Sequence, residues 1–410
     1  MCLVIIYNME HEFIVACKDN DLNKIQQMIH MVDMLLNKGF RMACKNGHID
    51  VVQYLVQNTD IDIHANYNEG FRWACENGHI DVVKYLVSLG VDIHATSEAG
   101  FGLACCNGHI DVVKHLVLLG VDIHAIDEAG FRMACYHGHI DVVQYLVQNT
   151  DIDIHANNES GFISACCNGH IDVVKYLVQN TDIHTKKEKK EELVTVACMN
   201  GHIDVVKYLV SLGVDIHAIK KDSFKWACKN GHIDVVKYLV SFDVDIHAQY
   251  EECFTLACTN GHIDIVKYLV SLNVNIHAQY EEGFTGACMN GHIDVVNYLV
   301  SLGVDININA IKDQCFRIAC QNGHIDVVQY LVSLGVDIHA IKDNCFRIAC
   351  QNGHIDVVKY LVSLDVDIHT RDEKGFRWAC QNGHSDIVNY LLSLNVDIHA
   401  KKEEGFTSML

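Results

Sequence analysis

Apolar and polar positions follow a pattern that repeats about every 30 residues. In the unit from Glu98 to Ala125, one set of apolar residues fits a single face of a short helix. This set consists of Phe101, Leu103, Ala104 and Cys105. A second set has the spacing of another amphipathic helix and consists of Ile110, Val113, Leu116 and Val117. Each unit is therefore predicted to contain a helix, a turn, a second helix and a connection.

A Gly-His dipeptide marks the turn between the two predicted helices. It is followed by Ile-Asp, once by Ser-Asp, and occurs twelve times between His48 and His384, at intervals of 30 to 32 residues. Glycine readily adopts the left-handed conformation that ends a helix, so these glycines are predicted structural turns. Examples are Gly78, Gly108, Gly138, Gly231 and Gly323. The second helix has a stop of its own two residues before the Asp or Asn of Asp-Ile-His, where all twelve units carry Gly, Asn or Asp, and a left-handed residue is expected there too.

One two-helix unit cannot bury its own apolar face, so stability must come from stacking against neighbours. The predicted fold class is all-α, a helix-turn-helix solenoid of about 13 repeats. The charged run from Lys186 to Glu192 and the extra residues Asn307-Ile308-Asn309 interrupt the regular spacing, and both are interpreted as surface loop insertions. The predicted domains are a degenerate capping repeat and three subarrays, the last of which ends in a truncated repeat. Their bounds are 1–36, 37–182, 183–306 and 307–410.

The repeated sequence resembles a known family. Ala-Cys-x-Asn-Gly-His-Ile-Asp-Val-Val-x-Tyr-Leu-Val, continued by Gly-Val-Asp-Ile-His-Ala, is similar to the ankyrin consensus, and the resemblance extends from residue 13 to 410. The chain looks like the ankyrin-repeat proteins of giant amoeba-infecting DNA viruses, and the absence of proline fits their AT-rich coding. Ankyrin units have about 33 residues. Short turns are therefore expected in place of hairpin fingers, with the first helix beginning near Glu98, Glu128 and Glu159.

Composition narrows the class of partner. The net charge is −21, which repels phosphate backbones and anionic lipid, so neither nucleic acid nor a membrane surface is an expected partner. The apolar start of the chain lacks the features of a signal peptide. Thirteen of the 19 cysteines recur at one position of the repeat, which indicates core thiols and a reducing compartment. A cytoplasmic location is expected, with the nucleus as an alternative.

Variable positions within the constant frame predict the binding surface. By resemblance to ankyrin arrays, the loop tips and the first helices line the face that contacts a partner. The candidate partner-binding residues are Tyr67, Trp73, Thr96, Ile126, Trp226, Tyr250, Tyr280, Lys312, Lys342, Arg371 and Trp378. Exposed Trp and Tyr residues would be suited to binding hot spots. The alternative for the Trp set is a core position that varies in size.

The abundant histidines do not indicate chemistry. Repeated Gly-His and Asp-Ile-His sequences place equivalent imidazoles one repeat apart, too far to share a metal ion, so hydrogen bonds to loop backbone are expected instead. The pairs Cys253/Cys258, Cys315/Cys320 and Cys345/Cys350 are five residues apart and would diverge on a helix. Apart from the core cysteine, no nucleophile occurs at a fixed spacing beside these histidines, and no phosphate-binding loop is present. No enzyme, metal or cofactor is expected.

The sequence therefore predicts a monomeric, non-catalytic scaffold that binds another protein, with a host protein as partner if the chain is viral. The alternative function is a substrate-recruiting adaptor of a ubiquitin ligase, for which residues 1–12 and those after His399 leave no room for a separate module. By resemblance to ankyrin loops, His94 and its equivalents are also candidate sites of hydroxylation by an oxygenase.

Overall fold

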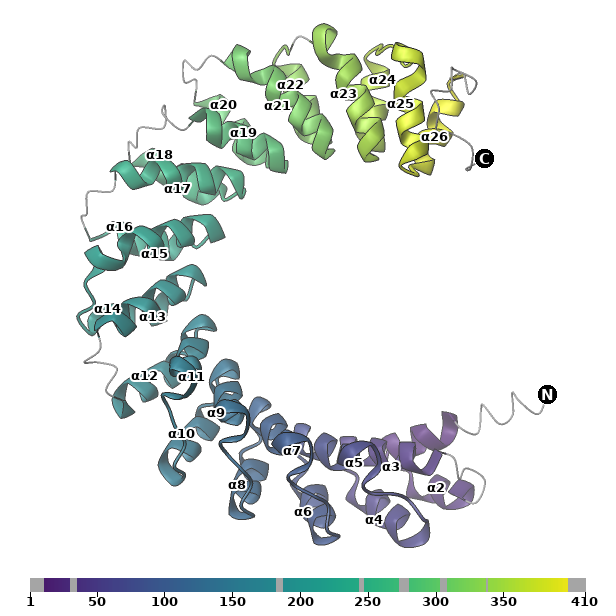
Figure 1. Ribbon diagram of the computed structural model, residues 1–410, viewed down its shortest axis with the longest axis vertical. Coiled ribbons are helices and arrows are strands. Elements are labelled where there is room, and N and C mark those ends of the chain that lie inside the picture. Colours follow the sequence, from purple (N-terminus) through teal and green to yellow (C-terminus); the bar gives the residue numbers. More distant parts are fainter. Residues whose placement is uncertain are drawn as a thin grey trace, which may run out of the picture. The chain divides into compact units, whose positions relative to one another are not determined.

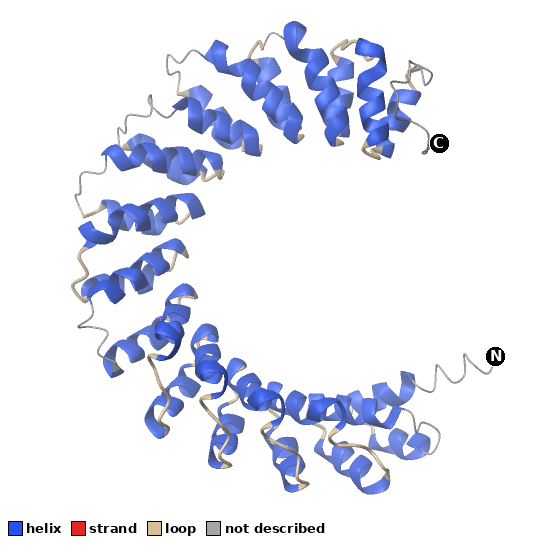
Figure 2. Cartoon of the chain, viewed as in Figure 1, coloured by secondary structure: helices blue, strands red, loops and turns tan. Residues whose placement is uncertain are grey.

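The computed structural model describes residues 11–29, 35–181, 187–242, 247–272, 280–302, 308–336 and 338–396. Within these ranges the regular secondary structure is helical, as Figures 1 and 2 show, and strands are absent. This confirms the predicted all-α solenoid. The chain divides into two compact units, Met1–Asp215 and Ile216–Leu410. The division into three subarrays stays a prediction, since its breaks lie inside these units. None of the described helices could cross a membrane, because none combines the required length and apolarity.

The first unit begins with a helix over 11–18 and α2 (Leu22–Met28). Its inner helices, which are the first helices of the repeats, are α3 (Leu36–Asn46), α5 (Ala65–Glu76), α7 (Ala95–Cys106), α9 (Ala125–His137), α11 (Ala156–Cys167) and α13 (Lys187–Met199). Its outer helices are α4 (Ile49–Asn58), α6 (Ile80–Ser88), α8 (Ile110–Leu118), α10 (Ile140–Asn149), α12 (Ile171–Asn180) and α14 (Ile203–Ser211).

The second unit repeats the same alternation. Its inner helices are α15 (Ile216–Asn230), α17 (His247–Thr259), α19 (Tyr280–Asn290), α21 (Ile308–Asn322), α23 (Ile338–Asn352) and α25 (Thr370–Gln381). Its outer helices are α16 (Ile233–Val240), α18 (Ile263–Ser271), α20 (Ile293–Ser301), α22 (Ile325–Ser333), α24 (Ile355–Ser363) and α26 (Ser385–Leu392). The predicted loop insertions are wrong in part, because the run after Lys186 forms the start of α13 and Ile308 begins α21.

The core of each repeat is built from one triplet on each helix. In the repeat of α7 and α8 the buried residues of the inner helix are Phe101, Ala104 and Cys105, and those of the outer helix are Val112, Val113 and Leu116. Burying one Phe, Leu or Val side chain contributes about 1.5–3 kcal/mol, so each repeat adds a similar increment of stability. The predicted core residues Leu103, Ile110 and Val117 are only half-buried, at the edge of this layer.

A glycine before the core phenylalanine lets successive inner helices approach closely. A β-carbon at Gly100 would lie 2.7 Å from Cε1 of Phe71 in the preceding repeat. That distance is shorter than any van der Waals contact, so a larger residue would push α5 and α7 apart. Glycine thus allows the close packing of these inner helices, whereas α15, α17, α21 and α23 accommodate Ser223, Cys253, Cys315 and Cys345 at the same position.

The outer helices end in two ways. Gly90 and Gly120 have φ of 85° and 81°, as the sequence predicts. The expectation of a left-handed residue is wrong at Asp60, Asp151 and Asn180. At Asp60 and Asp151 the preceding residue, Thr59 or Thr150, is extended, and its hydroxyl donates to a carbonyl four residues earlier. Asn180 is the last residue of α12, and the extended Thr181 ends that helix. The equivalent positions Asp243, Asn273 and Gly303 lie outside the described residues.

The connections differ between the units. In α5, α7, α9 and α11, three successive residues are left-handed before the right-handed helix begins. The right-handed part starts directly after Glu98, Glu128 and Glu159, where the sequence predicts it. In α15 and α23, by contrast, the helix begins earlier than predicted, at the Ile of Asp-Ile-His.

Candidate functional site

The inner helices of each unit form a continuous layer with the connecting loops at its edge. Within the first unit α5 packs closely on α7, α7 on α9 and α9 on α11, while neighbouring outer helices touch at few positions. The row of inner helices in Figure 1 is therefore the more compact layer of this unit. The loop tips at 66–68, 96–98 and 126–128 directly precede the right-handed part of these inner helices.

The loop tips of the first unit hold Tyr67, Thr96 and Ile126 in the left-handed conformation, with φ of 58°, 57° and 53°. Tyr67 is 74% exposed and Ile126 is 63% exposed. A left-handed residue with a side chain costs about 1–2 kcal/mol, and each tip has three in succession. Such a conformation persists only where surrounding contacts hold it in place.

Arginine side chains supply part of that hold. Nη2 of Arg132 donates to the carbonyl oxygen of Ile126 at 3.1 Å. In the tip two repeats earlier, Arg72 donates from Nε and Nη2 to the carbonyls of Tyr67 and Asn66 at 3.2 and 3.1 Å. Each arginine directly follows the core phenylalanine of its own inner helix. The tips of Tyr67 and Ile126 are thus tied to the buried part of their repeats, whereas the Thr96 tip has Gly102 at the arginine position.

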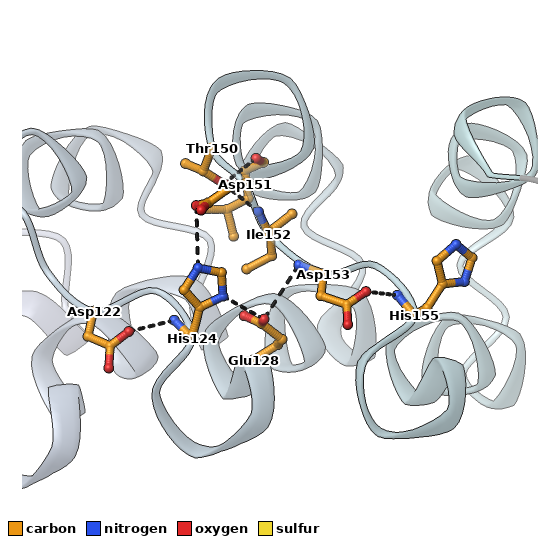
Figure 3. A network of polar contacts seen from close by, with 9 residues as sticks. Asp122, His124, Glu128, Thr150, Asp151, Ile152, Asp153 and His155 are labelled. Atoms are coloured by element: carbon orange, nitrogen blue, oxygen red, sulfur yellow. Dashed lines mark hydrogen bonds and ion pairs between the residues drawn. The ribbon is translucent and has the colours of Figure 1, made fainter.

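A buried glutamate supplies the rest of the hold, as Figure 3 shows for Glu128. His124 Nδ1 donates to Glu128 Oε1 at 2.7 Å, and the same oxygen accepts from the backbone N–H of Asp153 in the next repeat at 3.4 Å. On its other side, His124 Nε2 lies 3.3 Å from Asp151 Oδ1. His124 N in turn donates to Asp122 Oδ1 at 3.0 Å. The Asp-Ile-His sequence is therefore a clamp between repeats.

The clamp recurs in neighbouring repeats. Glu98 Oε1 accepts from His94 Nδ1 at 2.7 Å and from the backbone N–H of Asp122 at 3.3 Å. At the first tip an amide replaces the carboxylate: Asn68 Oδ1 is 3.1 Å from His64 Nδ1, and Asn68 Nδ2 donates to the carbonyl of Asp92. His369 and Glu373 form the same contact in the second unit, at 2.6 Å.

The clamps shift the titration of their histidines. Glu98, Glu128 and Glu373 each accept a hydrogen bond from an imidazole, which raises the pKa of His94, His124 and His369 respectively. The three carboxylates are almost fully buried, whereas the imidazoles are half-exposed. A protonated imidazole thus compensates a charge that would otherwise be buried alone.

The Gly-His turns also connect neighbouring repeats. The five predicted turn glycines, Gly78, Gly108, Gly138, Gly231 and Gly323, have φ between 74° and 86°. The imidazole of the next repeat covers each of them; for Gly108 a β-carbon would lie 2.4 Å from Nδ1 of His139. His139 Nε2 donates to the carbonyl of Cys106 at 2.8 Å. The repeated histidines therefore bond loop backbone across the repeat boundary.

The three tryptophans are half-buried on the inner helices, neither in the core nor fully exposed. Each carries a lysine ammonium over its ring. Lys45 Nζ is 5.2 Å from the centre of Trp73, Lys229 Nζ is 4.7 Å from that of Trp226, and Lys374 Nζ is 4.6 Å from that of Trp378. These cation–π contacts hold the indole rings in place.

Of the remaining candidate partner-binding residues, one is partly buried and four have side chains outside the described residues. Lys312 is half-buried, and its Nζ donates to the carbonyl of Leu334 in the next repeat at 2.9 Å. This ammonium group therefore already bonds the next repeat and is less available to a partner protein. Tyr250, Tyr280, Lys342 and Arg371 belong to helices, and their side chains lie outside the described residues.

The sequence interpretation missed part of the apolar surface. Nine large apolar side chains are exposed among the described residues, and seven of them lie between residues 67 and 136. These seven are Tyr67, Leu89, Leu118, Leu119, Ile126, Met133 and Tyr136. Tyr136 occupies the variable position between Ala-Cys and the Gly-His turn, and Leu118 stands where most repeats have Ser. These two departures from the repeat are the features of the sequence that could have indicated exposed apolar side chains here.

The second unit presents a different surface. A shallow groove of about 820 Å³ follows its Asn-Gly-His turns. Amide and imidazole side chains line most of it, with Met289 at one end. Several of these groups are already bonded across the repeat boundary; Asn322 Nδ2 and Asn352 Nδ2 donate to the carbonyls of Met289 and Gln321, each at 2.8 Å. The groove is thus polar and has few free donors.

Comparisons with known proteins point to one family. A family model described as ankyrin repeats (3 copies) matches overlapping stretches that cover residues 13–97 and 101–402. Among solved structures, the crystal structure of the human ASB11 ankyrin repeat domain is similar, with 20% sequence identity and a TM-score of 0.36. That alignment covers 43% of this chain and 84% of the other chain. None of the curated proteins matches the chain.

Proposed function

Because the chain belongs to the ankyrin-repeat family, we propose that it is a non-catalytic scaffold that binds another protein through residues 67–136. Ankyrin repeats generally mediate protein–protein interaction. The proposed location of the binding surface rests on the concentration of exposed large apolar side chains in this stretch. Scattered apolar residues on a surface are ordinary, but several on consecutive repeats mark an interaction site.

The fixed backbone of the loop tips also supports residues 67–136 as the binding surface. Tyr67 and Ile126 occupy tips whose backbone is fixed by Arg72, Arg132 and buried Glu128. A side chain on a fixed backbone loses little conformational entropy when a partner binds, so more of its burial appears as affinity. The strained left-handed residues are consistent with this role, because strain concentrates at functional sites.

The charge of this surface indicates the chemistry of the partner. Residues 66–139 contain nine Asp and Glu against four Lys and Arg, a net charge of −5 with neutral histidine. A partner with an apolar patch and a basic rim would complement this surface and be attracted to it at low ionic strength. Acidic proteins and nucleic acid would be repelled.

The resemblance to the ankyrin-repeat proteins of giant DNA viruses suggests a more specific role for the scaffold. The proposed partner is a host protein, and the proposed location is the cytoplasm, where the chain would act as a monomer. The 30-residue units and the absence of proline support this assignment. Recruitment of substrates to a ubiquitin ligase is the competing role.

The test is affinity purification of the tagged full chain from lysate under reducing conditions, with cross-linking and mass spectrometry. The proposal predicts one dominant protein whose cross-links map to residues 67–136. Cullin-type subunits in the same complex would support the ligase role instead. Cross-links confined to the second unit would place the binding surface elsewhere and contradict the proposed location.

A further inference from the structure

Six cysteines of the second unit meet in pairs across neighbouring repeats. The pairs are Cys228 with Cys253, Cys288 with Cys315, and Cys320 with Cys345. The first member of each pair is the core cysteine of an inner helix, and the second directly precedes the core phenylalanine of the next inner helix. The inner helices concerned pack on one another, and all six side chains are buried. The eighteen described cysteines are unbridged thiols.

Other repeats show how closely these two positions approach. Most of them have glycine before the core phenylalanine, and a β-carbon at Gly283 would lie 3.2 Å from Sγ and 3.3 Å from Cβ of Cys258. At Gly130 the distance to Sγ of Cys105 is also 3.2 Å. Bridged cysteines have Cβ atoms about 3.5–4.5 Å apart. The backbone of the solenoid therefore holds these two positions close to disulfide range wherever both carry cysteine.

The two cysteine side chains of each pair are neighbours across the interface between their inner helices. At the equivalent glycines of other repeats, a β-carbon would lie 2.9–3.4 Å from Sγ of the core cysteine, so the two sulfur atoms can meet with little movement of the helices. The repeats with glycine lack the second thiol and serve as natural counterparts that cannot bridge.

We propose that these three thiol pairs are reversible modification sites at which a peroxide-class oxidant forms disulfide bridges between neighbouring repeats. In the first step a thiolate sulfur attacks a peroxide oxygen and the O–O bond breaks. This gives a sulfenic acid and one water, which takes up the proton of that thiol. In the second step the partner sulfur attacks the sulfenic sulfur, the S–S bond forms and the S–O bond breaks. The leaving hydroxide takes the second thiol proton as water, so two electrons pass from the sulfur atoms to one peroxide.

The pair Cys288–Cys315 is the one poised to react first. Oγ1 of Thr285 lies 3.7 Å from Sγ of Cys315 and can donate a hydrogen bond to its thiolate. The neighbouring Cys288 thiol lowers the pKa of Cys315, whereas the same contact and burial raise the pKa of Cys288. Because the Thr285 hydroxyl can stabilise a thiolate at Cys315, Cys315 is assigned as the attacking sulfur and Cys288 as the resolving one.

A bridge at these sites would close loops of moderate length. The paired cysteines are 25, 27 and 25 positions apart. Each bridge restricts the unfolded chain and should raise the melting temperature of the second unit. In a reducing compartment the bridges would form only during oxidative stress and would be removed afterwards.

The test uses the full chain treated with hydrogen peroxide, then blocked with N-ethylmaleimide after unfolding, digested and analysed by mass spectrometry. The proposal predicts linked peptides for the three pairs, a loss of two hydrogens per bridge, and full reversal by dithiothreitol. The Cys288–Cys315 link should appear at the lowest peroxide dose. A rise in melting temperature should accompany bridging.

The control variants are Cys253→Gly, Cys315→Gly and Cys345→Gly, which introduce the residue found at that position in most repeats. Each should fold, as circular dichroism would show, and should lose only its own link. Full labelling of the six cysteines after peroxide treatment would overturn the proposal. So would links that join these cysteines at random, as expected for protein oxidised in urea.

Discussion

The substitution Gly108→Ala tests the contact that joins successive Gly-His turns. Gly108 has φ of 74°, and its β-carbon would lie 2.4 Å from Nδ1 of His139. The left-handed backbone alone costs about 1–2 kcal/mol. The new methyl group must also displace His139, whose bond to the Cys106 carbonyl contributes about 0.5–1.5 kcal/mol. The expected destabilisation is therefore about 1.5–3.5 kcal/mol.

Gly120→Ala is the matched control, because it introduces the left-handed alanine without displacing a histidine. Gly120 has φ of 81°, but nothing lies within 4 Å of its β-carbon. It should lose only the backbone contribution, about 1–2 kcal/mol. The assay is denaturant unfolding followed by circular dichroism, with hydrogen exchange read by mass spectrometry to localise the loss. Faster exchange should appear in α7 to α10 for Gly108→Ala. Equal destabilisation by the two variants would refute the assigned role of His139.

Three further predictions follow from the contacts between repeats. Because the pKa of His124 is raised, the stabilising charge on its contact with Glu128 is fully present below about pH 6.5 and is lost as the pH rises through the higher folded value. Glu128→Gln should therefore lower the melting temperature more at pH 6 than at pH 9, and a pH-independent difference would contradict this. Arg132→Met should speed hydrogen exchange around Ile126 while leaving the outer helices protected; unchanged exchange would show that the arginine does not hold the tip. Deletion of residues 315–344 removes one whole repeat and should leave a shorter, folded array by circular dichroism, whereas aggregation would argue against additive stacking.

The features predicted correctly from the sequence depend on local stereochemistry. Gly108 and its equivalents are recognisable because a left-handed helix end selects glycine at a fixed place. Phe101, Ala104 and Cys105 are recognisable because a buried helix face has a regular spacing. In both cases the pattern recurs twelve times or nearly so, which reinforces a weak local signal.

The features that could not be predicted depend on side-chain contacts to loop backbone, within a repeat and with the next one. Ile126 is left-handed although a β-branched residue disfavours that conformation, because Arg132 and the clamp at Glu128 hold the tip. Glu128 itself would be expected in solvent, yet it is buried beneath His124 and bonds the backbone of the following repeat. The contact of Glu128 with the backbone of Asp153 spans 25 residues, and the contact of Arg132 with Ile126 depends on a left-handed loop, so neither belongs to a regular helical spacing. The exposure of Tyr67 and Ile126 was therefore anticipated from the variable loop tips, whereas that of Tyr136 was not.

The measurement that tests the scaffold most directly is the affinity of the identified partner for matched surface variants, read by calorimetry. The test variant combines Tyr67→Ala, Ile126→Ser and Tyr136→Ala; the control is Leu392→Ala, which removes an exposed apolar side chain far along the chain. Truncating hot-spot residues costs about 2 kcal/mol or more, so the test variant should bind at least about 30-fold more weakly while keeping its melting temperature. The control should bind like the unmodified chain. Equal affinity of the test variant and the unmodified chain would contradict the assignment of residues 67–136 as the binding surface.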